Sequence, residues 1–470
     1  MTVSRENKIL KNTMIYAVGN FGSKILAYIM VLVYTYYIGA EELGYYDLIL
    51  TTISLFLPII ICSYDEGIYR WLIDDSKRNK IEIVSNCIKT VIFTTCLAII
   101  VLLLINVKFH IQYVGFIAAM LGSSTIYQVI LNAVRGMSNS HVYALSGIIN
   151  SVILLFLEIL GLVVLGMGIE ALLISKTMAN ILTILFIFMR QPSLRGFLTC
   201  RFNTKLSKSM LSYSLPLIPN SLSWWIVNSS DRYIILLFLG TAYNGIYAIA
   251  NKFPTIITTI TGIVYLALQE SVIKEYDSPD RDSFYSKVFR QYYTLIFSLI
   301  ICAIPATKLM IGLFVSTEYQ SAWQYTGFLY LSTVFSALSS FLGIGYQISR
   351  ETKRSVVSTV SSAGVNIAVN IMLIQFIGLY AASFSTFAAY LFLFVLRIIH
   401  SKKYFTLHIK WSEFISMFII SILVSVVTYI GSLMTVILTT VFCIALMLIL
   451  NKKFALHILE KIGRINNEKI

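Results

Sequence analysis

The segment NSSDRYIILLFLGTAYNGIYAIANKFP, residues 228–254, sets three charged side chains into a stretch that is otherwise mostly apolar. Its two apolar runs flank a short turn at Gly240, which predicts two antiparallel membrane helices joined by a tight loop. At a rise of about 1.5 Å per residue, Arg232 and Lys252 would each lie roughly 10 Å below the membrane surface, with Asp231 beside the arginine. Charges at that depth are costly unless they face water, an opposite charge or an anionic ligand.

Composition places this segment in a polytopic membrane protein. The chain of 470 residues is 57% hydrophobic and only 12% charged, with a mean hydropathy of +0.80. Its apolar residues recur in runs of about 20, the length at which a helix spans a bilayer. The first long run begins near Met14 and lacks a small-residue cleavage site, so we expect it to be retained as the first helix.

Fourteen membrane helices are predicted, with the N-terminus in the cytoplasm. In that orientation about 30 of the Lys and Arg residues fall in cytoplasmic loops, helix ends or tails, which is the positive-inside distribution. Membrane insertion and contact with anionic lipid therefore explain the net charge of +14, and nucleic-acid binding is not expected. The predicted helices span residues 14–38, 46–70, 83–105, 113–134, 142–165, 170–189, 210–239, 246–269, 286–306, 323–346, 355–376, 379–399, 413–431 and 433–450.

An internal repeat relates the two halves of the chain. YYIGAEELGYYDL (37–49) aligns with LFLGTAYNGIYAI (238–250), so that Gly44 matches Gly245. Because each repeat has an even number of helices, both have the same orientation in the membrane. The expected fold is all-α, with two parallel, pseudo-symmetric six-helix lobes around a central cavity and two extra C-terminal helices.

Later residues continue the repeat, because Asn150 and Asn366 fall at similar places in the fifth and eleventh predicted helices.

None of the predicted loops is long enough to hold a catalytic domain, so the function is expected to lie between the helices. The predicted domains are an N-terminal lobe at 1–190, a basic cytoplasmic linker at 191–209, a C-terminal lobe at 210–400, and two helices with a basic tail at 401–470.

The first helix carries the deepest predicted cation. Lys24 lies near the helix centre, too deep to reach the interface easily, and Asn20 and Tyr28 lie one turn to either side of it. Polar stripes of this kind are also typical of interhelical hydrogen-bonded seams. The functional alternative is a contact surface for sugar hydroxyls and phosphate.

The quoted hairpin allows the same two interpretations. Asp231, Arg232 and Lys252 would form a structural network that holds the hairpin, or the cations would line a cavity for an anionic substrate. Asn251 lies next to Lys252 at the start of a polar stripe along the eighth predicted helix. We therefore take Lys24, Arg232, Lys252, Asn20, Tyr28 and Asn251 as candidate substrate-binding residues.

Carboxylates within the predicted helices have two possible roles. Glu158 and Lys176 flank the short turn at 166–169 at nearly equal depth and are expected to form a structural pair. Glu158 is also a candidate ion-coupling residue, as is Asp231, because a carboxylate away from bulk water can carry a proton.

The cysteines and histidines lack metal-ligand spacing, and no GxxxxGK[ST] motif occurs, so no metal and no cofactor are expected.

The stretch PLIPNSLSWWIVNSSDRYIILLFLGTAYNGIYAIANKFP (216–254) resembles the segment that opens the second lobe of Wzx-type polysaccharide flippases, members of the MOP superfamily with a MATE-like fold. Residues 37–49 and the Arg135–Gly136 pair fit the same family, and the resemblance covers essentially the whole chain. It implies a carrier that moves an undecaprenyl-pyrophosphate-linked oligosaccharide from the inner to the outer leaflet by alternating access, coupled to H⁺ or Na⁺. It also implies a cationic cavity, in which Lys24, Arg232 and Lys252 would lie.

The same resemblance implies a bacterial cytoplasmic membrane protein with both termini in the cytoplasm, which serves O-antigen, lipopolysaccharide or capsule synthesis beside a polysaccharide polymerase. Alternatives stay open: a MATE-type drug exporter, a peptidoglycan-precursor flippase, a membrane glycosyl polymerase or ligase, and a non-transporting scramblase or scaffold subunit. Drug exporters of this fold usually carry an acid in the first helix, whereas this sequence has Lys24 and no acid between Thr13 and Gly39. We expect a transporter and no enzyme, because the predicted outer loops are too short for a catalytic site.

Overall fold

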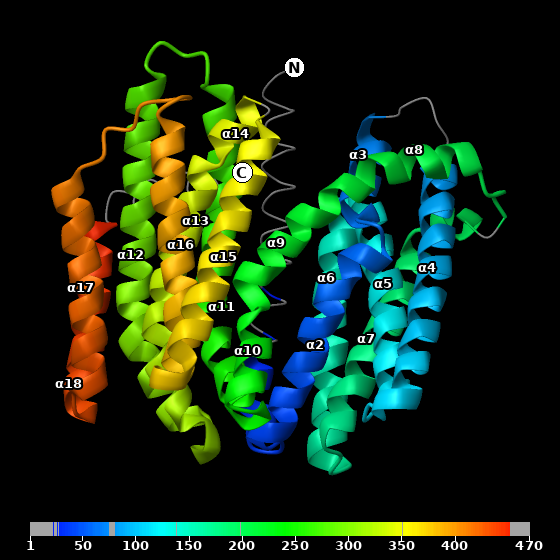
Figure 1. Cartoon of the computed structure of the whole chain (residues 1–470), viewed down its shortest axis with the longest axis horizontal. Coiled ribbons are helices and arrows are strands. Elements are labelled where there is room, and N and C mark those ends of the chain that lie inside the picture. The colour runs from blue at the N-terminus through cyan, green and yellow to red at the C-terminus, as the bar shows by residue number, and fades with distance from the viewer. Residues whose placement is uncertain are drawn as a thin grey trace, which may run out of the picture. The chain divides into compact units, whose positions relative to one another are not determined.

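The computed structural model describes residues 28–74, 80–137, 139–197, 199–349 and 351–451, together with Gly22 and Leu26. All regular secondary structure in these residues is helical (Figure 1). Twelve of the described helical segments are long and apolar enough to cross a membrane. The prediction of an all-α polytopic membrane protein is confirmed.

Each of these twelve segments overlaps a predicted span. The predicted helix 14–38 lies mostly outside the described residues, and the predicted helix 210–239 is divided into shorter helices. The number of fourteen spans therefore stays a prediction.

Unit 1, Met1–Gly245, is the first of two compact units, and the boundary between them falls in the first turns of helix α11 (Thr241–Lys274). Its long helices are α2 (Ala40–Ile60), α4 (Lys80–Phe109), α5 (Val114–Gly136), α6 (Ser140–Ile159) and α7 (Ile169–Arg190). Its shorter segments are α3 (Tyr64–Asp74), η1 (Leu160–Val164), η2 (Pro192–Phe197), α8 (Thr204–Ser214), η3 (Leu215–Leu217), α9 (Ile218–Ser229) and α10 (Asp231–Phe238).

Two predicted helices of unit 1 are interrupted, each for a local reason. The predicted helix 46–70 is two helices, because Cys62 and Ser63 adopt left-handed backbone with φ angles of 53° and 50° between α2 and α3. The predicted helix 210–239 is interrupted at η3, where Pro216 and Pro219 lack the backbone N–H that a continuous helix needs. Apolar length alone predicts neither interruption.

A close helix approach in unit 1 involves the aligned glycines of the repeat. A Cβ atom on Gly44 would lie 1.9 Å from the carbonyl oxygen of Thr241, and one on Gly245 would lie 2.0 Å from that of Ala40. Asn244 Nδ2 donates to the Gly44 carbonyl oxygen at 2.9 Å. The starts of α2 and α11 therefore cross backbone to backbone, at a distance that only glycine allows.

Unit 2, Ile246–Ile470, contains the rest of α11 and the following helices. These are α12 (Arg281–Phe314), η4 (Thr317–Tyr325), α13 (Thr326–Leu342), α14 (Ile344–Ile348), α15 (Thr352–Ile377), α16 (Leu379–Ser401), α17 (Trp411–Ile430) and α18 (Leu433–Leu450). Aromatic rings fill much of its core. Phe414 of α17 stacks on Phe394 of α16 at a centroid distance of 5.8 Å, and both rings contact Phe335 of α13.

Buried amides join equivalent helices in both units. In unit 1, Asn150 Nδ2 donates to Thr183 Oγ1 at 3.2 Å and joins α6 to α7. In unit 2, Asn366 Nδ2 donates to Thr386 Oγ1 at 3.3 Å and joins α15 to α16. The two asparagines matched in the sequence thus make the same kind of contact, each inside its own unit.

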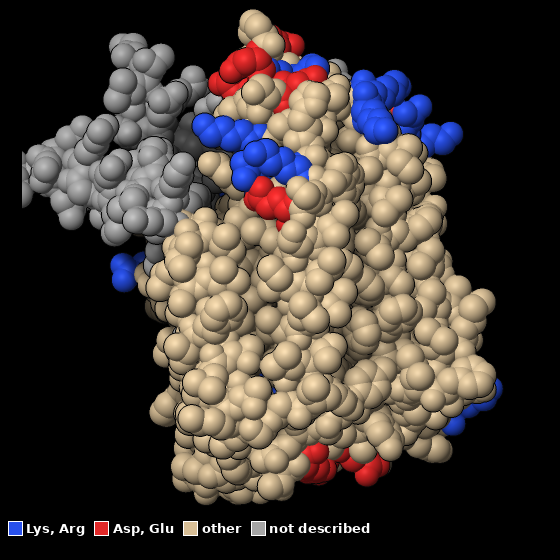
Figure 2. Space-filling view, turned by 90° about the vertical axis from the view of Figure 1, so that its left-hand side faces the viewer, with Lys and Arg blue, Asp and Glu red and all other residues tan. Residues whose placement is uncertain are grey.

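One face of unit 2 carries its charged side chains near the helix ends. On the face of unit 2 shown in Figure 2, Lys, Arg, Asp and Glu gather at the two ends, and the broad band between them carries almost no charge. An apolar belt of this kind matches the hydrocarbon of a bilayer.

Candidate functional site

Unit 1 carries a polar band where α2 lies beside α9 and α10. Arg232 Nε lies 3.3 Å from Asp47 Oδ2, and the two side chains are only 12% and 15% exposed. The Arg232 guanidinium also donates to the carbonyl oxygen of Asn228 at 2.8 Å. A cation predicted to be costly in the membrane is thus compensated by an acid of another helix.

This partner was not predicted from the sequence. The sequence places Arg232 beside Asp231, its chain neighbour, whereas Asp47 is 185 residues away along the chain. Asp231 itself is buried at the start of α10, with 1% of its surface exposed.

Aromatic side chains extend the polar band. Trp225 Nε1 donates to the Thr51 carbonyl oxygen at 3.2 Å and to Ser54 Oγ at 3.0 Å. The hydroxyl groups of Tyr233 and Thr52 lie 2.6 Å apart. Because the rings of Trp225 and Tyr233 are 5.9 Å apart, the band offers an aromatic surface beside the ion pair.

Unit 2 carries a second polar face along α11. Lys252 and Thr255 are exposed on this helix, and Gly262 lies on the same exposed face. Asn251 is half-buried, and its Nδ2 donates to the Tyr247 carbonyl oxygen at 2.9 Å. An exposed lysine among threonines is unfavourable in hydrocarbon, so this face of α11 is suited to a water-filled space.

Of the three candidate residues in the first predicted helix, the structure describes one. Lys24 and Asn20 lie outside the described residues. Tyr28 lies in the described helical part and is half-buried. The assignment of these three residues to a substrate surface stays a prediction.

The predicted pair of Glu158 and Lys176 lies on adjacent helices of unit 1. Glu158 of α6 is 4% exposed, and Lys176 of α7 is half-buried. Tyr46 of α2 lies near Glu158. The pairing and the ion-coupling roles of Glu158 and Asp231 stay predictions.

Sequence reasoning also overlooked a buried cation. Arg397 of α16 is 3% exposed and donates to the Ser339 carbonyl oxygen at 2.8 Å, and also to the Thr359 and Ser358 hydroxyls at 3.1 and 3.3 Å. From the sequence, Arg397 is expected among the cations at the cytoplasmic helix ends. Among the described residues, no group of three or more His, Cys, Asp or Glu side chains could hold a metal ion.

Solved structures with this fold are membrane transporters. The lipid II flippase MurJ in an inward closed conformation aligns with a TM-score of 0.70 and 14% identity over 95% of this chain and 100% of that chain. An inward-facing multidrug resistance MATE family transporter of the MOP superfamily aligns with a TM-score of 0.61 and 11% identity over 86% of this chain and 95% of that chain. The Vibrio cholerae MATE transporter VcmN aligns with a TM-score of 0.57 and 12% identity over 86% of this chain and 97% of that chain.

The fold is therefore MATE-like, which confirms the predicted fold class. The chain belongs to the polysaccharide biosynthesis protein family, whose model matches residues 9–273. No curated protein matches the chain by sequence. The family match and the fold agree with the resemblance to Wzx-type flippases, and the solved structures that share the fold are of transporters.

Proposed function

We propose that the protein is a flippase that moves an undecaprenyl-pyrophosphate-linked oligosaccharide repeat unit from the cytoplasmic to the outer leaflet. The observation that carries this proposal is the exposed cationic face of α11, which displays Lys252, in a chain of the polysaccharide biosynthesis family. The fold that the chain shares with the lipid II flippase MurJ supports a lipid-linked substrate.

In this proposal the cations receive the pyrophosphate. A bare pyrophosphate cannot cross hydrocarbon, and charge-assisted hydrogen bonds from Lys24, Arg232 and Lys252 would replace the water that it loses. Asp47 would hold Arg232 in position. The side chains of Asn20, Tyr28 and Asn251 would contact the sugar hydroxyls, while the polyprenyl chain stays in the lipid.

Transport would proceed by alternating access, with the two repeats rocking against each other. We propose H⁺ or Na⁺ as the coupling ion and Glu158 or Asp231 as the residue that binds it. Both carboxylates are buried, as an ion-binding group shielded from bulk water would be.

The proposed location is the bacterial cytoplasmic membrane, with both termini in the cytoplasm. The product, a lipid-linked repeat unit in the outer leaflet, would be consumed by a polysaccharide polymerase that builds O-antigen or capsule. The positive-inside distribution of Lys and Arg supports this orientation.

A second candidate is flipping of a peptidoglycan precursor, which the fold shared with MurJ favours. Complementation separates the two functions. The protein should restore surface polysaccharide in a strain that lacks its polysaccharide flippase, and should fail to restore growth in a strain that lacks its lipid II flippase. The opposite result would support the second candidate.

A further inference from the structure

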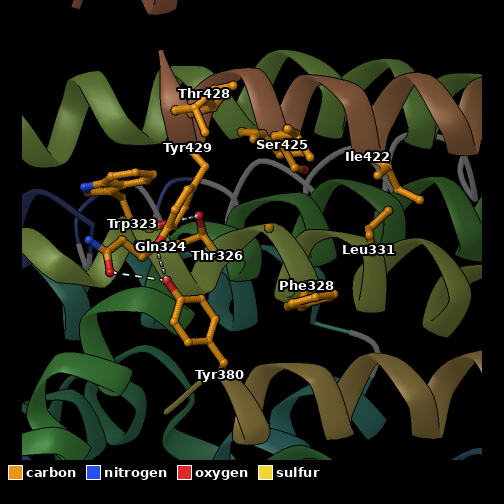
Figure 3. A pocket seen from close by; sticks show the side chains of 14 residues that line it. Trp323, Gln324, Thr326, Phe328, Leu331, Tyr380, Ile422, Ser425, Thr428 and Tyr429 are labelled. Atoms are coloured by element: carbon orange, nitrogen blue, oxygen red, sulfur yellow. Dashed lines mark hydrogen bonds between the residues drawn. The ribbon is translucent and has the colours of Figure 1, made fainter. Parts of the chain in front are cut away.

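A separate crevice lies wholly within unit 2. It has a volume of about 250 Å³ and lies between α13, α16 and α17, beside η4 (Figure 3). The lining side chains differ between its two ends. Trp323, Gln324 and Tyr380 lie at one end, and Phe328, Leu331 and Ile422 lie toward the other.

The interior of the crevice is an apolar channel along one face of α17. Ile422, Ser425, Val426 and Tyr429 line it at helical spacing, so the lined face extends for about 10 Å along the helix. The Ser425 hydroxyl donates to the Ser421 carbonyl oxygen at 2.8 Å, so it is already satisfied within the helix. This part of the crevice offers carbon surface to its occupant.

The other end of the crevice carries hydroxyl groups that can form further hydrogen bonds. The Tyr380 hydroxyl lies 3.3 Å from Gln324 Oε1 and 3.1 Å from the Tyr429 hydroxyl. Thr428, which also lines the crevice, is 2% exposed, and its Oγ1 has no hydrogen-bond partner among the described residues. A buried hydroxyl without a partner is costly, and a polar group of a bound molecule would satisfy it.

A cation lies beside this polar end. Lys308 of α12 donates to the Thr428 and Gly431 carbonyl oxygens at 2.6 and 3.2 Å, where α17 ends. Its Nζ atom also lies 4.3 Å from the centre of the Trp323 ring. These contacts fix the ammonium group next to two residues that line the crevice and leave its third N–H for an anion.

The apolar end and the polar end together determine which kind of molecule fits the crevice. A sugar would bring many hydroxyls to an interior that is mostly carbon, and those hydroxyls would lose their water without replacement. An ion alone would leave the apolar channel unfilled. A molecule with a hydrocarbon chain and an anionic, hydrogen-bonding end satisfies both ends.

The surroundings indicate where such a molecule comes from. On α17, Leu423 beside the crevice and Ile430 in its lining have 57% and 77% of their surfaces accessible. Large apolar side chains at that exposure in a membrane span face lipid. We propose that the crevice holds one acyl chain of an anionic phospholipid, with its phosphate at Lys308 and Thr428. This inference goes beyond the proposed flippase function and does not depend on it.

Trp323 supplies the probe that tests this proposal. The full-length protein, with Trp71, Trp224, Trp225 and Trp411 replaced by Phe, would be placed in nanodiscs of phosphatidylcholine or phosphatidylglycerol whose acyl chains are brominated close to the headgroup. Bromine in contact with the indole ring quenches its fluorescence. We expect stronger quenching by the brominated phosphatidylglycerol than by the brominated phosphatidylcholine.

Substituted variants separate the crevice from ordinary lipid contact. Gly327→Leu places a side chain in the crevice, because a Cβ there would lie 3.5 Å from Ser425 Oγ, and it should lose most of the quenching. Gly312→Leu is the matched control, because a Cβ at Gly312 has no neighbour within 4 Å, and it should retain the quenching. Lys308→Gln should weaken the preference for phosphatidylglycerol about fivefold.

Native mass spectrometry of the wild-type protein gives a readout that does not depend on the tryptophan replacements. It should show a retained phosphatidylglycerol that Gly327→Leu loses and Gly312→Leu keeps. Equal quenching and equal lipid retention in both glycine variants would overturn the proposal. Displacement of the brominated lipid by undecaprenyl phosphate, and not by added phosphatidylglycerol, would also overturn it.

Discussion

Arg232 of α10 and Asp47 of α2 form an ion pair in unit 1, with Nε 3.3 Å from Oδ2 and both side chains largely buried. The pair explains how an arginine is accommodated in an apolar span. It also allows two roles for Arg232 to be tested separately. If the pair only holds α2 and α10 together, the two charges can be exchanged without loss of function. If Arg232 contacts an anionic substrate, the positive charge must stay at position 232.

Reversal of the ion pair tests these roles. Arg232→Ala alone should destabilise the protein by about 3 kcal/mol, because it leaves a largely buried carboxylate uncompensated. The double variant Asp47→Arg with Arg232→Asp should recover much of that stability, measured by thermal unfolding in detergent. We expect it to fold and to lose export of the polysaccharide. Full export by the reversed pair would limit Arg232 to a structural role.

Lys252 provides the more direct test of substrate contact, because it is exposed on α11. Lys252→Ala should reduce the rate of export about tenfold, through loss of a charge-assisted hydrogen bond, without loss of expression. Lys252→Arg should retain most of the activity. Lys205→Ala, which removes an exposed lysine of α8, is the control and should leave export unchanged. Wild-type export by Lys252→Ala would exclude this contact.

The glycine crossing of α2 and α11 predicts a large effect of a small change. Gly44→Ala should destabilise the protein by about 3 kcal/mol, because the added Cβ alone would lie 1.9 Å from the carbonyl oxygen of Thr241. Gly115→Ala in α5, where a Cβ has no neighbour within 4 Å, should change stability by no more than about 1 kcal/mol. Thermal unfolding of the purified variants measures both effects. Similar melting temperatures for both would contradict the close crossing.

A cluster between α14 and α15 predicts a dependence of stability on pH. Hydrogen bonds from Lys403 and Tyr404 lower the pKa of Glu351 below its ordinary value of 4.5, and Arg354 adds a smaller effect. A carboxylate with a lowered pKa stabilises the folded state above the ordinary value, and this contribution is lost as the pH falls through the lowered pKa. The melting temperature of the wild type should therefore fall more steeply below pH 4.5 than that of Glu351→Gln. Parallel curves would contradict this assignment.

Much of the fold follows from local sequence. Apolar runs predict the spans because a bilayer requires about 20 apolar residues in a helix, whatever the rest of the chain does. The matched glycines, Gly44 and Gly245, form a close helix crossing in unit 1, and the matched asparagines, Asn150 and Asn366, make equivalent hydrogen bonds.

What could not be predicted depends on partners distant in the chain or on backbone geometry. Asp47 is an ordinary acid near a helix start until the fold brings it to Arg232. Arg397 lies four residues from the end of α16, where a sequence reader expects an arginine side chain to extend to water, yet neighbouring helices bury it. The break at Cys62 arises from left-handed backbone in a segment whose apolar composition predicts a continuous helix.

Translocation in proteoliposomes tests the central claim most directly. A purified undecaprenyl-pyrophosphate-linked repeat unit would be reconstituted with the protein, and its exposure at the vesicle surface would be followed with an impermeant glycosidase. Wild-type protein should make the sugar in both leaflets accessible, and the Lys252→Ala variant should do so about tenfold more slowly. If wild-type protein leaves the inner-leaflet sugar inaccessible, with and without gradients of H⁺ and Na⁺, the protein is not a flippase for this substrate.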